Sequence, residues 1–240
     1  MLHIILLECQ LELVPKQISA LKEVQQHAAR RRKHPCSTLL DQAYHGRAIM
    51  RLPNHERRGR PDIVHMCLMT LLESPLCKSR LLRVHLHLMD GTIVELEPDV
   101  RLPRNYERFC GLIEQLLERG RVPPTGDPLL RVTGISLHDL IEPYLHDSEA
   151  IVMLASESGT PTSSAELAEL LPPDSSKPVL VGVGAFPHGD FSNEVSSLFK
   201  IHRRFDPEVM MAWHVCAQVL WTYSLRIDIT RHRFGELNGS

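Results

Sequence analysis

The stretch Val179-Leu-Val-Gly-Val-Gly-Ala-Phe-Pro-His-Gly-Asp190 contains a short apolar run followed by a glycine-containing loop. The run is rich in β-branched residues and follows Pro178, so it predicts a buried strand. Gly184 and Gly189 lack a Cβ atom, which would let the chain turn sharply and a ligand approach the backbone closely. The glycine spacing matches neither the dinucleotide-binding fingerprint nor the phosphate-binding P-loop. An ordinary strand-to-loop transition explains the same residues, so the stretch alone leaves both interpretations open.

Short apolar strands and helical patterns alternate through the C-terminal half of the chain, which is typical of βαβ units and a mainly parallel sheet. The predicted fold class is therefore α/β, with ligands expected where loops leave the carboxyl ends of central strands. Asp90-Gly91 lies between two strand-like runs and predicts a hairpin. Toward the C-terminus we expect a strand over 198–201, a long helix over 207–225 and a weakly held tail over 226–240.

Composition narrows the class of protein. Hydrophobic residues make up 43% and charged residues 23% of the 240 residues, as in soluble globular proteins. No apolar run reaches about 18 residues, so we expect no membrane span. The six cysteines form no C-x-x-C pair, which indicates buried thiols in a reducing compartment and favours a cytoplasmic location. His85 and His87 alternate on a predicted strand without a third ligand nearby, so we expect no metal site.

Charge is distributed unevenly along the chain. Residues 1–60 carry eleven Lys and Arg against five Asp and Glu, whereas residues 137–197 carry one Lys against ten Asp and Glu. Such asymmetry suggests a basic face for a polyanion on one side of the molecule. Solvated surface charges account for the same counts, and counting alone does not separate the two.

Two arginine-containing segments are the sharpest candidates for that face. Arg60-Pro61-Asp62 opens a helix that is apolar on nearly all sides, so Arg60 and Asp62 should lie at the rim of a buried element. Arg101, Arg104 and Arg108 precede or begin another helix and should point away from its apolar stripe, as phosphate-binding guanidinium groups would. The alternatives are a plain helix-start charge at Asp62, and a solvated face in which the arginines pair with Glu107 or Glu114.

Four motifs in order are recognisable together: Leu11-Glu-Leu-Val-Pro15, Arg60-Pro-Asp-Ile-Val-His65, Arg101-Leu-Pro-Arg-Asn-Tyr-Glu-Arg-Phe-Cys-Gly111 and Val183-Gly-Ala-Phe-Pro-His-Gly189. This ordered set resembles the ribosome-biogenesis pseudouridine N1-specific methyltransferases of the SPOUT superfamily, and the compact length resembles an archaeal member. The resemblance spans nearly the whole chain.

The resemblance implies a SPOUT-type α/β fold with a parallel sheet and a C-terminal trefoil knot. It implies one methyltransferase domain over 1–240, with a hairpin and helical extension inserted at about 40–100. It also implies a homodimer that uses S-adenosyl-L-methionine to methylate N1 of a pseudouridine in a loop of small-subunit ribosomal RNA.

Site residues follow from the same resemblance. Arg60, Arg101, Arg104 and Arg108 match the family's RNA-binding positions, and Asp62 matches the aspartate that steadies the nearby arginine. Because the ring N–H of the base must lose its proton, our own hypothesis is that Asp62, with Arg60 beside it, orients the base or assists that loss. The segment 202–211 departs from the compact turn of the relatives, which leaves its register open. The implied cofactor-binding residues are Gly184, Gly189, Ser156, Glu157, Ile201, His202, Val209 and Met210.

Other functions remain open at this point. One is an RNA-binding ribosome-assembly factor in which methylation is secondary or absent. Another is a related enzyme that acts on a different RNA or a different atom. A simple nucleotide-binding protein is the weakest alternative, because neither phosphate-binding glycine pattern is present.

Overall fold

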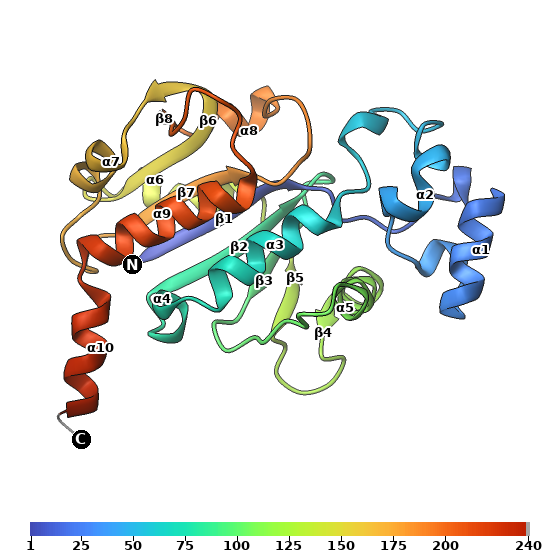
Figure 1. Ribbon diagram of the computed structural model, residues 1–240, viewed down its shortest axis with the longest axis horizontal. Coiled ribbons are helices and arrows are strands. Elements are labelled where there is room, and N and C mark those ends of the chain that lie inside the picture. Colours follow the sequence, from blue (N-terminus) through green and yellow to red (C-terminus); the bar gives the residue numbers. More distant parts are fainter. Residues whose placement is uncertain (239–240) are drawn as a thin grey trace.

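The computed structural model describes residues 1–238 and contains an eight-stranded sheet with helices on both faces (Figure 1). The strand order is β4-β5-β3-β2-β1-β7-β6-β8. The strands from β2 to β8 in that order pair in parallel, and β3, β5 and β4 form an antiparallel edge. The predicted α/β class with a mainly parallel sheet is therefore confirmed. The strands are β1 Leu2–Cys9, β2 Leu82–Leu88, β3 Ile93–Leu96, β4 Arg121–Val122, β5 Leu130–Thr133, β6 Ile151–Pro161, β7 Val179–Gly184 and β8 Ile201–Arg204.

The inner strands β1 and β7 of the parallel part of the sheet have residues that are almost all buried. A strand buried on both faces needs apolar side chains in succession rather than in alternation, which explains both apolar runs. Gly182 is required by this packing, because a Cβ atom there would lie 2.6 Å from Leu7 Cδ1 and 2.9 Å from Leu154 Cδ1. The stretch that predicted a buried strand thus lies in the middle of the parallel part of the sheet.

Helices cover both faces of the sheet. The helices α3 (Pro61–Leu72) and α9 (Ala212–Arg226) lie side by side on one face (Figure 1) and share its main core. The helices α6 (Leu137–Leu145) and α8 (Asn193–Ser197) cover the opposite face. All six cysteines are free, and all but Cys36 are buried, as the sequence predicted. The remaining helices of the main body are α4 Pro75–Lys78, α5 Tyr106–Arg119, α7 Ser164–Leu170 and α10 Ile229–Asn238.

Residues 11–59 form a small lobe beside the sheet, at the right of Figure 1. The lobe has a core of its own, made by Val14, Ile18, Val24, Leu40, Ala48, Ile49 and Leu52. The range of about 40–100, in which the sequence analysis expects an extension, is divided between the two parts of the structure. Helix α2 belongs to the lobe, whereas α3, β2 and β3 belong to the main body. The lobe contains the short 3-10 turns Lys16–Ile18, Pro35–Ser37 and His55–Arg57 and the helices α1 Lys22–Arg31 and α2 Gln42–Ile49.

A buried histidine pair lies inside the lobe. The backbone N–H of Asp41 donates to Nδ1 of His45 over 3.1 Å, so the hydrogen of His45 is on Nε2, which lies 2.9 Å from Nδ1 of His27. Burial lowers the pKa of His45 to about 4 and also lowers the pKa of His27. Both rings are therefore neutral at pH 7, and the polar pair is satisfied within the lobe.

The lobe is fastened to α5 through one buried carboxylate. Glu114 is fully buried and accepts hydrogen bonds from Arg31 Nη2 (2.9 Å), Lys33 Nζ (2.6 Å) and the backbone N–H of Leu39 (2.9 Å). All three donors belong to the lobe, whereas Glu114 belongs to the main body. A buried charge needs such partners, because water does not reach it.

Three C-terminal predictions were wrong in their boundaries. The last strand is 201–204 rather than 198–201, because Leu198 and Phe199 continue the helical turn of α8 through backbone hydrogen bonds. The helix expected from 207 begins at Ala212, because the residues before it form a loop. The expected tail contains the helix α10, and Arg233 ties it to α4 by donating to the carbonyl oxygen of Pro75 over 3.0 Å. No helix among residues 1–238 is long and apolar enough to cross a membrane.

Candidate functional site

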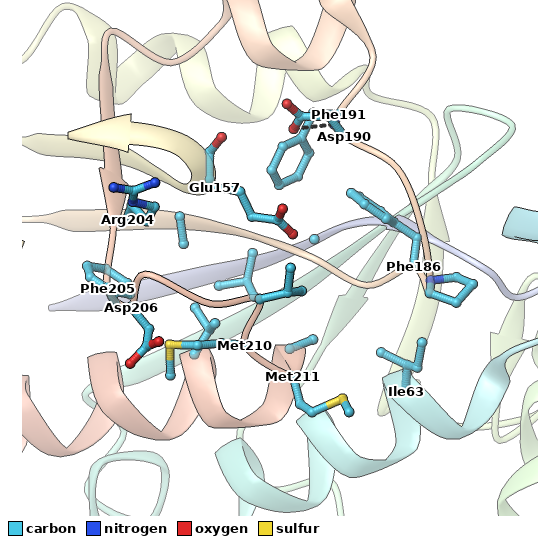
Figure 2. A pocket seen from close by; sticks show the side chains of 18 of the residues that line it. Ile63, Glu157, Phe186, Asp190, Phe191, Arg204, Phe205, Asp206, Met210 and Met211 are labelled. Atoms are coloured by element: carbon cyan, nitrogen blue, oxygen red, sulfur yellow. Dashed lines mark hydrogen bonds between the residues drawn. The ribbon is translucent and has the colours of Figure 1, made fainter. Parts of the chain in front are cut away.

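A cavity of about 510 Å³ lies at the carboxyl ends of β7 and β8 and beside the middle of β6, where the pairing of β6 with β8 shifts register between Ala155 and Thr160. Three segments surround it, together with the start of α3 and of α9 (Figure 2). The first comprises residues 155–157, the second is the loop 185–192, hereafter the 185–192 loop, and the third is the connection 203–211. Loops that follow parallel strands gather at one edge of a sheet, which is the position expected for a ligand site.

Six of the eight predicted cofactor-binding residues line this cavity: Ser156, Glu157, Gly184, Gly189, Val209 and Met210. Ile201 and His202 lie on β8 and are not among its lining residues in the described chain. His202 Nε2 lies 2.9 Å from the carbonyl oxygen of Phe199, and Ile201 packs against the main core. Most of the segment 202–211, whose register the sequence left open, thus lines the cavity, from Arg203 to Met211.

The two glycines of the opening motif serve different purposes. Gly189 has φ +87°, a left-handed conformation that favours glycine. At Gly184 a Cβ atom would lie 2.8 Å from Phe186 Cε1 and 3.1 Å from Phe191 Cζ. Gly184 therefore makes room for two aromatic rings, which meet edge to face with centroids 5.2 Å apart.

The lining combines apolar surface with acidic groups and with the guanidinium groups of Arg60, Arg203 and Arg204. Phe186, Phe191, Phe205, Met210 and Met211 supply aromatic and thioether surface around the cavity (Figure 2). This set suits a ligand that has a flat heteroaromatic ring together with hydroxyl groups and charged groups of both signs, since carboxylates accept hydrogen bonds and attract cations while guanidinium groups donate hydrogen bonds and attract anions. The cavity volume lies within the range of small-molecule sites. The carboxylates are Glu157, Asp190, Asp206 and Glu208.

Sequence reasoning missed most of the hydrophobic lining. Phe186 stood inside the recognised glycine motif, but neither it nor Phe191 was assigned a contact. The sequence did contain a signal for these two residues, since an aromatic side chain in a loop after a buried strand is expected to pack against neighbouring apolar groups or a ligand. Ile63 of α3 and Trp213 of α9 carried no such signal, because a core position and a cavity position look alike in a sequence.

Arg60 and Asp62 meet at the edge of the cavity, as the sequence predicted for the rim of a buried helix. Arg60 lines the cavity, and its guanidinium donates two hydrogen bonds of 2.8 Å to the carboxylate of Asp62. The hydrogen-bonded carboxylate raises the pKa of Arg60, so the arginine remains a cation. Asp62 is not among the residues that line the cavity within the described chain.

The segment with the other three arginines lies against α3. His65 Nε2 lies 3.1 Å from the carbonyl oxygen of Pro103, and the rings of His65 and Phe109 stack with centroids 4.4 Å apart. These contacts place residues 101–109 beside the helix that carries Arg60. The structure thus puts both arginine segments on neighbouring elements.

Arg101, Arg104 and Arg108 are exposed, and none of them forms an ion pair with residues 1–235, the part of the chain whose side chains the structure describes. The acidic partners considered for them bind elsewhere. Glu107 pairs with Arg31 at 3.1 Å, and Glu114 pairs with Arg31 and Lys33. Three free cations on one rigid segment suit contacts with phosphate.

One group of side chains in the described chain could hold a metal ion: His138, Asp139 and Glu142. All three are exposed on α6 and do not line the cavity. Asp139 is already engaged as part of the N-terminal capping box of α6 with Ser136. A helix cap explains this group without an ion.

Comparisons with known proteins agree with the motifs. The model of the EMG1/NEP1 methyltransferase family matches residues 4–224. The ribosomal RNA small subunit methyltransferase Nep1 of Staphylothermus marinus is 40% identical over 220 residues, which are 91% of this chain and 93% of that protein. The protein of the same name from Thermococcus kodakarensis is 40% identical over 229 residues, 95% of this chain and 100% of that protein.

A solved structure shares the fold. The crystal structure of Archaeoglobus fulgidus Nep1 bound to S-adenosylhomocysteine matches with a TM-score of 0.81 and 36% sequence identity, and the match covers 94% of this chain and 98% of that one. The family resemblance read from the ordered motifs is confirmed. The chain therefore belongs to the EMG1/NEP1 methyltransferase family.

Proposed function

We propose that this protein transfers the methyl group of S-adenosyl-L-methionine to N1 of a pseudouridine in small-subunit ribosomal RNA. The observation that carries the proposal is the cavity at the sheet edge, with Arg60 at its rim and Arg101, Arg104 and Arg108 on the neighbouring segment. Family membership supports the reaction type, and the related structure that contains S-adenosylhomocysteine supports the cofactor. The names of the relatives support the RNA substrate.

The lining of the cavity fits this cofactor. Aromatic and methionine side chains offer surface for an adenine ring, and the carboxylates of Glu157 and Asp190 offer acceptors for hydroxyl and amino groups. When bound, S-adenosyl-L-methionine supplies a methyl group that is already activated by a positive sulfonium. The eight residues Gly184, Gly189, Ser156, Glu157, Ile201, His202, Val209 and Met210 remain the proposed binding set, of which Ile201 and His202 would act from β8 outside the lining.

The protein's task in this reaction is placement. Holding two reactants in line can supply on the order of 7–11 kcal/mol of the barrier. Pseudouridine has a ring N1–H where uridine carries its sugar, so the reaction itself excludes uridine at this atom. The target base must leave its stack to reach a cavity, which fits a nucleotide in an RNA loop. Arg60 would hold the adjoining phosphate or base at the rim.

Two matched RNA hairpins test the function, one with pseudouridine in the loop and one with uridine. Each is incubated with the purified protein and S-adenosyl-L-methionine labelled on the methyl group. We expect transfer to the pseudouridine hairpin alone. Transfer to both hairpins would show that the methyl acceptor is a ribose or another base atom and not N1. Binding without transfer to either hairpin would favour an RNA-binding assembly factor.

Asp62 is the proposed group for orienting the base or assisting loss of the N1 proton. Asp62→Asn keeps the shape of the side chain but removes its charge, and we expect kcat to fall by about 10²-fold, the lower end of the range for a general base. Single-turnover methylation of the pseudouridine hairpin measures this, and a filter-binding assay measures RNA affinity. Full turnover together with unchanged RNA affinity would remove Asp62 from the mechanism.

We also propose that the protein works as a homodimer through the outer face of α9. Trp221 and Leu225 are four residues apart on this helix and are 52% and 80% exposed, and Met66 of the adjacent α3 is exposed as well. Exposed large apolar side chains that share a face mark interaction surfaces. We expect Trp221→Glu with Leu225→Glu to sediment as a monomer at a concentration where the unchanged protein is a dimer.

Met89→Glu is the control for this substitution, because Met89 is 48% exposed but lies at the β2–β3 turn. It should sediment like the unchanged protein. A monomeric unchanged protein, or a double variant that still forms dimers, would contradict the proposal. Three features remain predictions from the sequence: the trefoil knot, the single domain over 1–240 with an extension at about 40–100, and the cytoplasmic location.

A further inference from the structure

Arg57 belongs to the lobe by sequence but makes its contacts outside it. Its Nη2 donates to Glu8 Oε2 at the end of β1 over 2.7 Å, and its Nη1 donates to the carbonyl oxygen of Asp190 over 2.9 Å. The guanidinium carbon also lies over the ring of Phe186, 4.1 Å from its centroid. Asp190 and Phe186 are both part of the 185–192 loop, so one side chain holds this loop at two points.

Glu8 fixes the same loop at a third point. Its side chain is 4% exposed, and its second oxygen, Oε1, accepts a hydrogen bond of 3.0 Å from the backbone N–H of Ser192. The backbone of Glu8 has φ +52°, a left-handed conformation that non-glycine residues rarely adopt. Such a conformation persists only where surrounding contacts enforce it. The buried carboxylate therefore connects the guanidinium of Arg57 to the end of the loop.

The loop held in this way forms one wall of the cavity. Phe186, Gly189, Asp190 and Phe191 all line it. Gly189, with its left-handed φ, is at the turn of the loop, where glycine gives the backbone the greatest freedom. Without an external tie the loop would have many conformations, and binding a cofactor would then cost the entropy of ordering it.

We propose that Arg57 is a positioning residue that holds the 185–192 loop in the shape that binds the cofactor, and that the lobe thereby supports the cavity. The proposal rests on the proposed function for the identity of the cofactor. It requires arginine in particular, because two hydrogen bonds in different directions and a stacked planar face need a guanidinium. Lysine has the same charge, but its ammonium group has neither the divergent pair of N–H donors nor the planar face of a guanidinium.

The neighbouring residue provides a matched control. Arg58 also belongs to the lobe, and its side chain is 19% exposed against 18% for Arg57. It donates to both oxygens of Glu12, which is part of the lobe too. Arg58→Met therefore removes an arginine of similar exposure from the same segment without touching the loop, and leaves behind a carboxylate that is 31% exposed, against 4% for Glu8.

Calorimetric titration with S-adenosylhomocysteine tests the proposal on the full-length protein. We expect Arg57→Met to weaken binding by about tenfold or more, the equivalent of losing a charge-assisted hydrogen bond. Arg57→Lys should lie close to Arg57→Met, and Arg58→Met within about twofold of the unchanged protein. In methyl transfer, KM for S-adenosyl-L-methionine should rise while kcat at saturating cofactor stays within about threefold, since Arg57 touches no reacting atom.

Hydrogen exchange on the free protein gives a readout that needs no ligand. Residues 186–192 should exchange faster in Arg57→Met than in Arg58→Met. Unchanged exchange there, or equal loss of affinity in both variants, would overturn the role of Arg57. If the unchanged protein does not bind S-adenosylhomocysteine, the proposed cofactor is what fails, and the exchange of the loop alone decides whether Arg57 positions it.

Discussion

Replacing Glu114 by alanine is expected to lower the free energy of unfolding by about 3–5 kcal/mol and to loosen the lobe from the sheet. The carboxylate is fully buried and is shared by Arg31, Lys33 and the backbone N–H of Leu39. Its removal leaves a buried N–H without an acceptor and two cations without their common partner. Urea unfolding measures the loss, and limited proteolysis should cut the lobe first.

Glu107→Ala is the control, because Glu107 lies two turns away on the same helix and also pairs with Arg31. Its side chain is 49% exposed, so its removal should cost less than about 1 kcal/mol. Glu114→Gln should fall between the two, since an amide oxygen still accepts from Leu39. Equal losses for Glu114→Ala and Glu107→Ala would show that burial of the carboxylate does not fasten the lobe.

Reversing the charges of Arg104 and Arg108 together, by substituting glutamate for both, is expected to reduce affinity for the pseudouridine hairpin by about 100-fold. Each arginine is exposed and without an ionic partner in the described chain, so each is free to contact a phosphate. Each lost phosphate contact should also reduce the steepness of the dependence of affinity on salt by about one unit. Fluorescence anisotropy at several salt concentrations measures both effects.

Arg119→Glu reverses one charge at the other end of α5, half the change of net charge made by the double variant. Arg119 is exposed as well, so a general effect of protein charge on RNA affinity would appear in both variants. We expect Arg119→Glu to change affinity by less than about threefold. Equal effects at both ends of the helix would contradict a local RNA-binding face at residues 101–108.

The sequence was sufficient for the central elements of the fold. The apolar run before Gly184 predicted a buried strand because it is short, rich in β-branched residues and preceded by Pro178, as in a strand covered on both faces. Asp90-Gly91 predicted the hairpin because few dipeptides fit such a turn. The last strand was displaced because Arg203 and Arg204 occupy it, and a charged edge strand has no hydrophobic pattern.

The site was predictable where a local rule applied and unpredictable where distant contacts decide. Pro61 and Asp62 mark a helix start, so the rim position of Arg60 followed from sequence. The sequence did not show why a glycine is needed at position 184, because the tertiary fold places the aromatic rings that occupy the space beside it. The partners of Arg57 and Glu114 are likewise far away in sequence, and no periodicity reports them.

The position of β1 at the centre of the sheet also has a consequence for the order of assembly. Leu2 pairs with Leu82 on one side and with Val179 on the other, so both neighbours of this strand are made long after it. During synthesis the apolar segment Leu2–Cys9 emerges from the ribosome early and has no complete sheet to join until most of the chain is present. Contacts so distant in sequence slow folding, and until they form the apolar strand stays exposed and prone to aggregation. A nascent chain of this protein should therefore depend on chaperones for as long as β7 is missing.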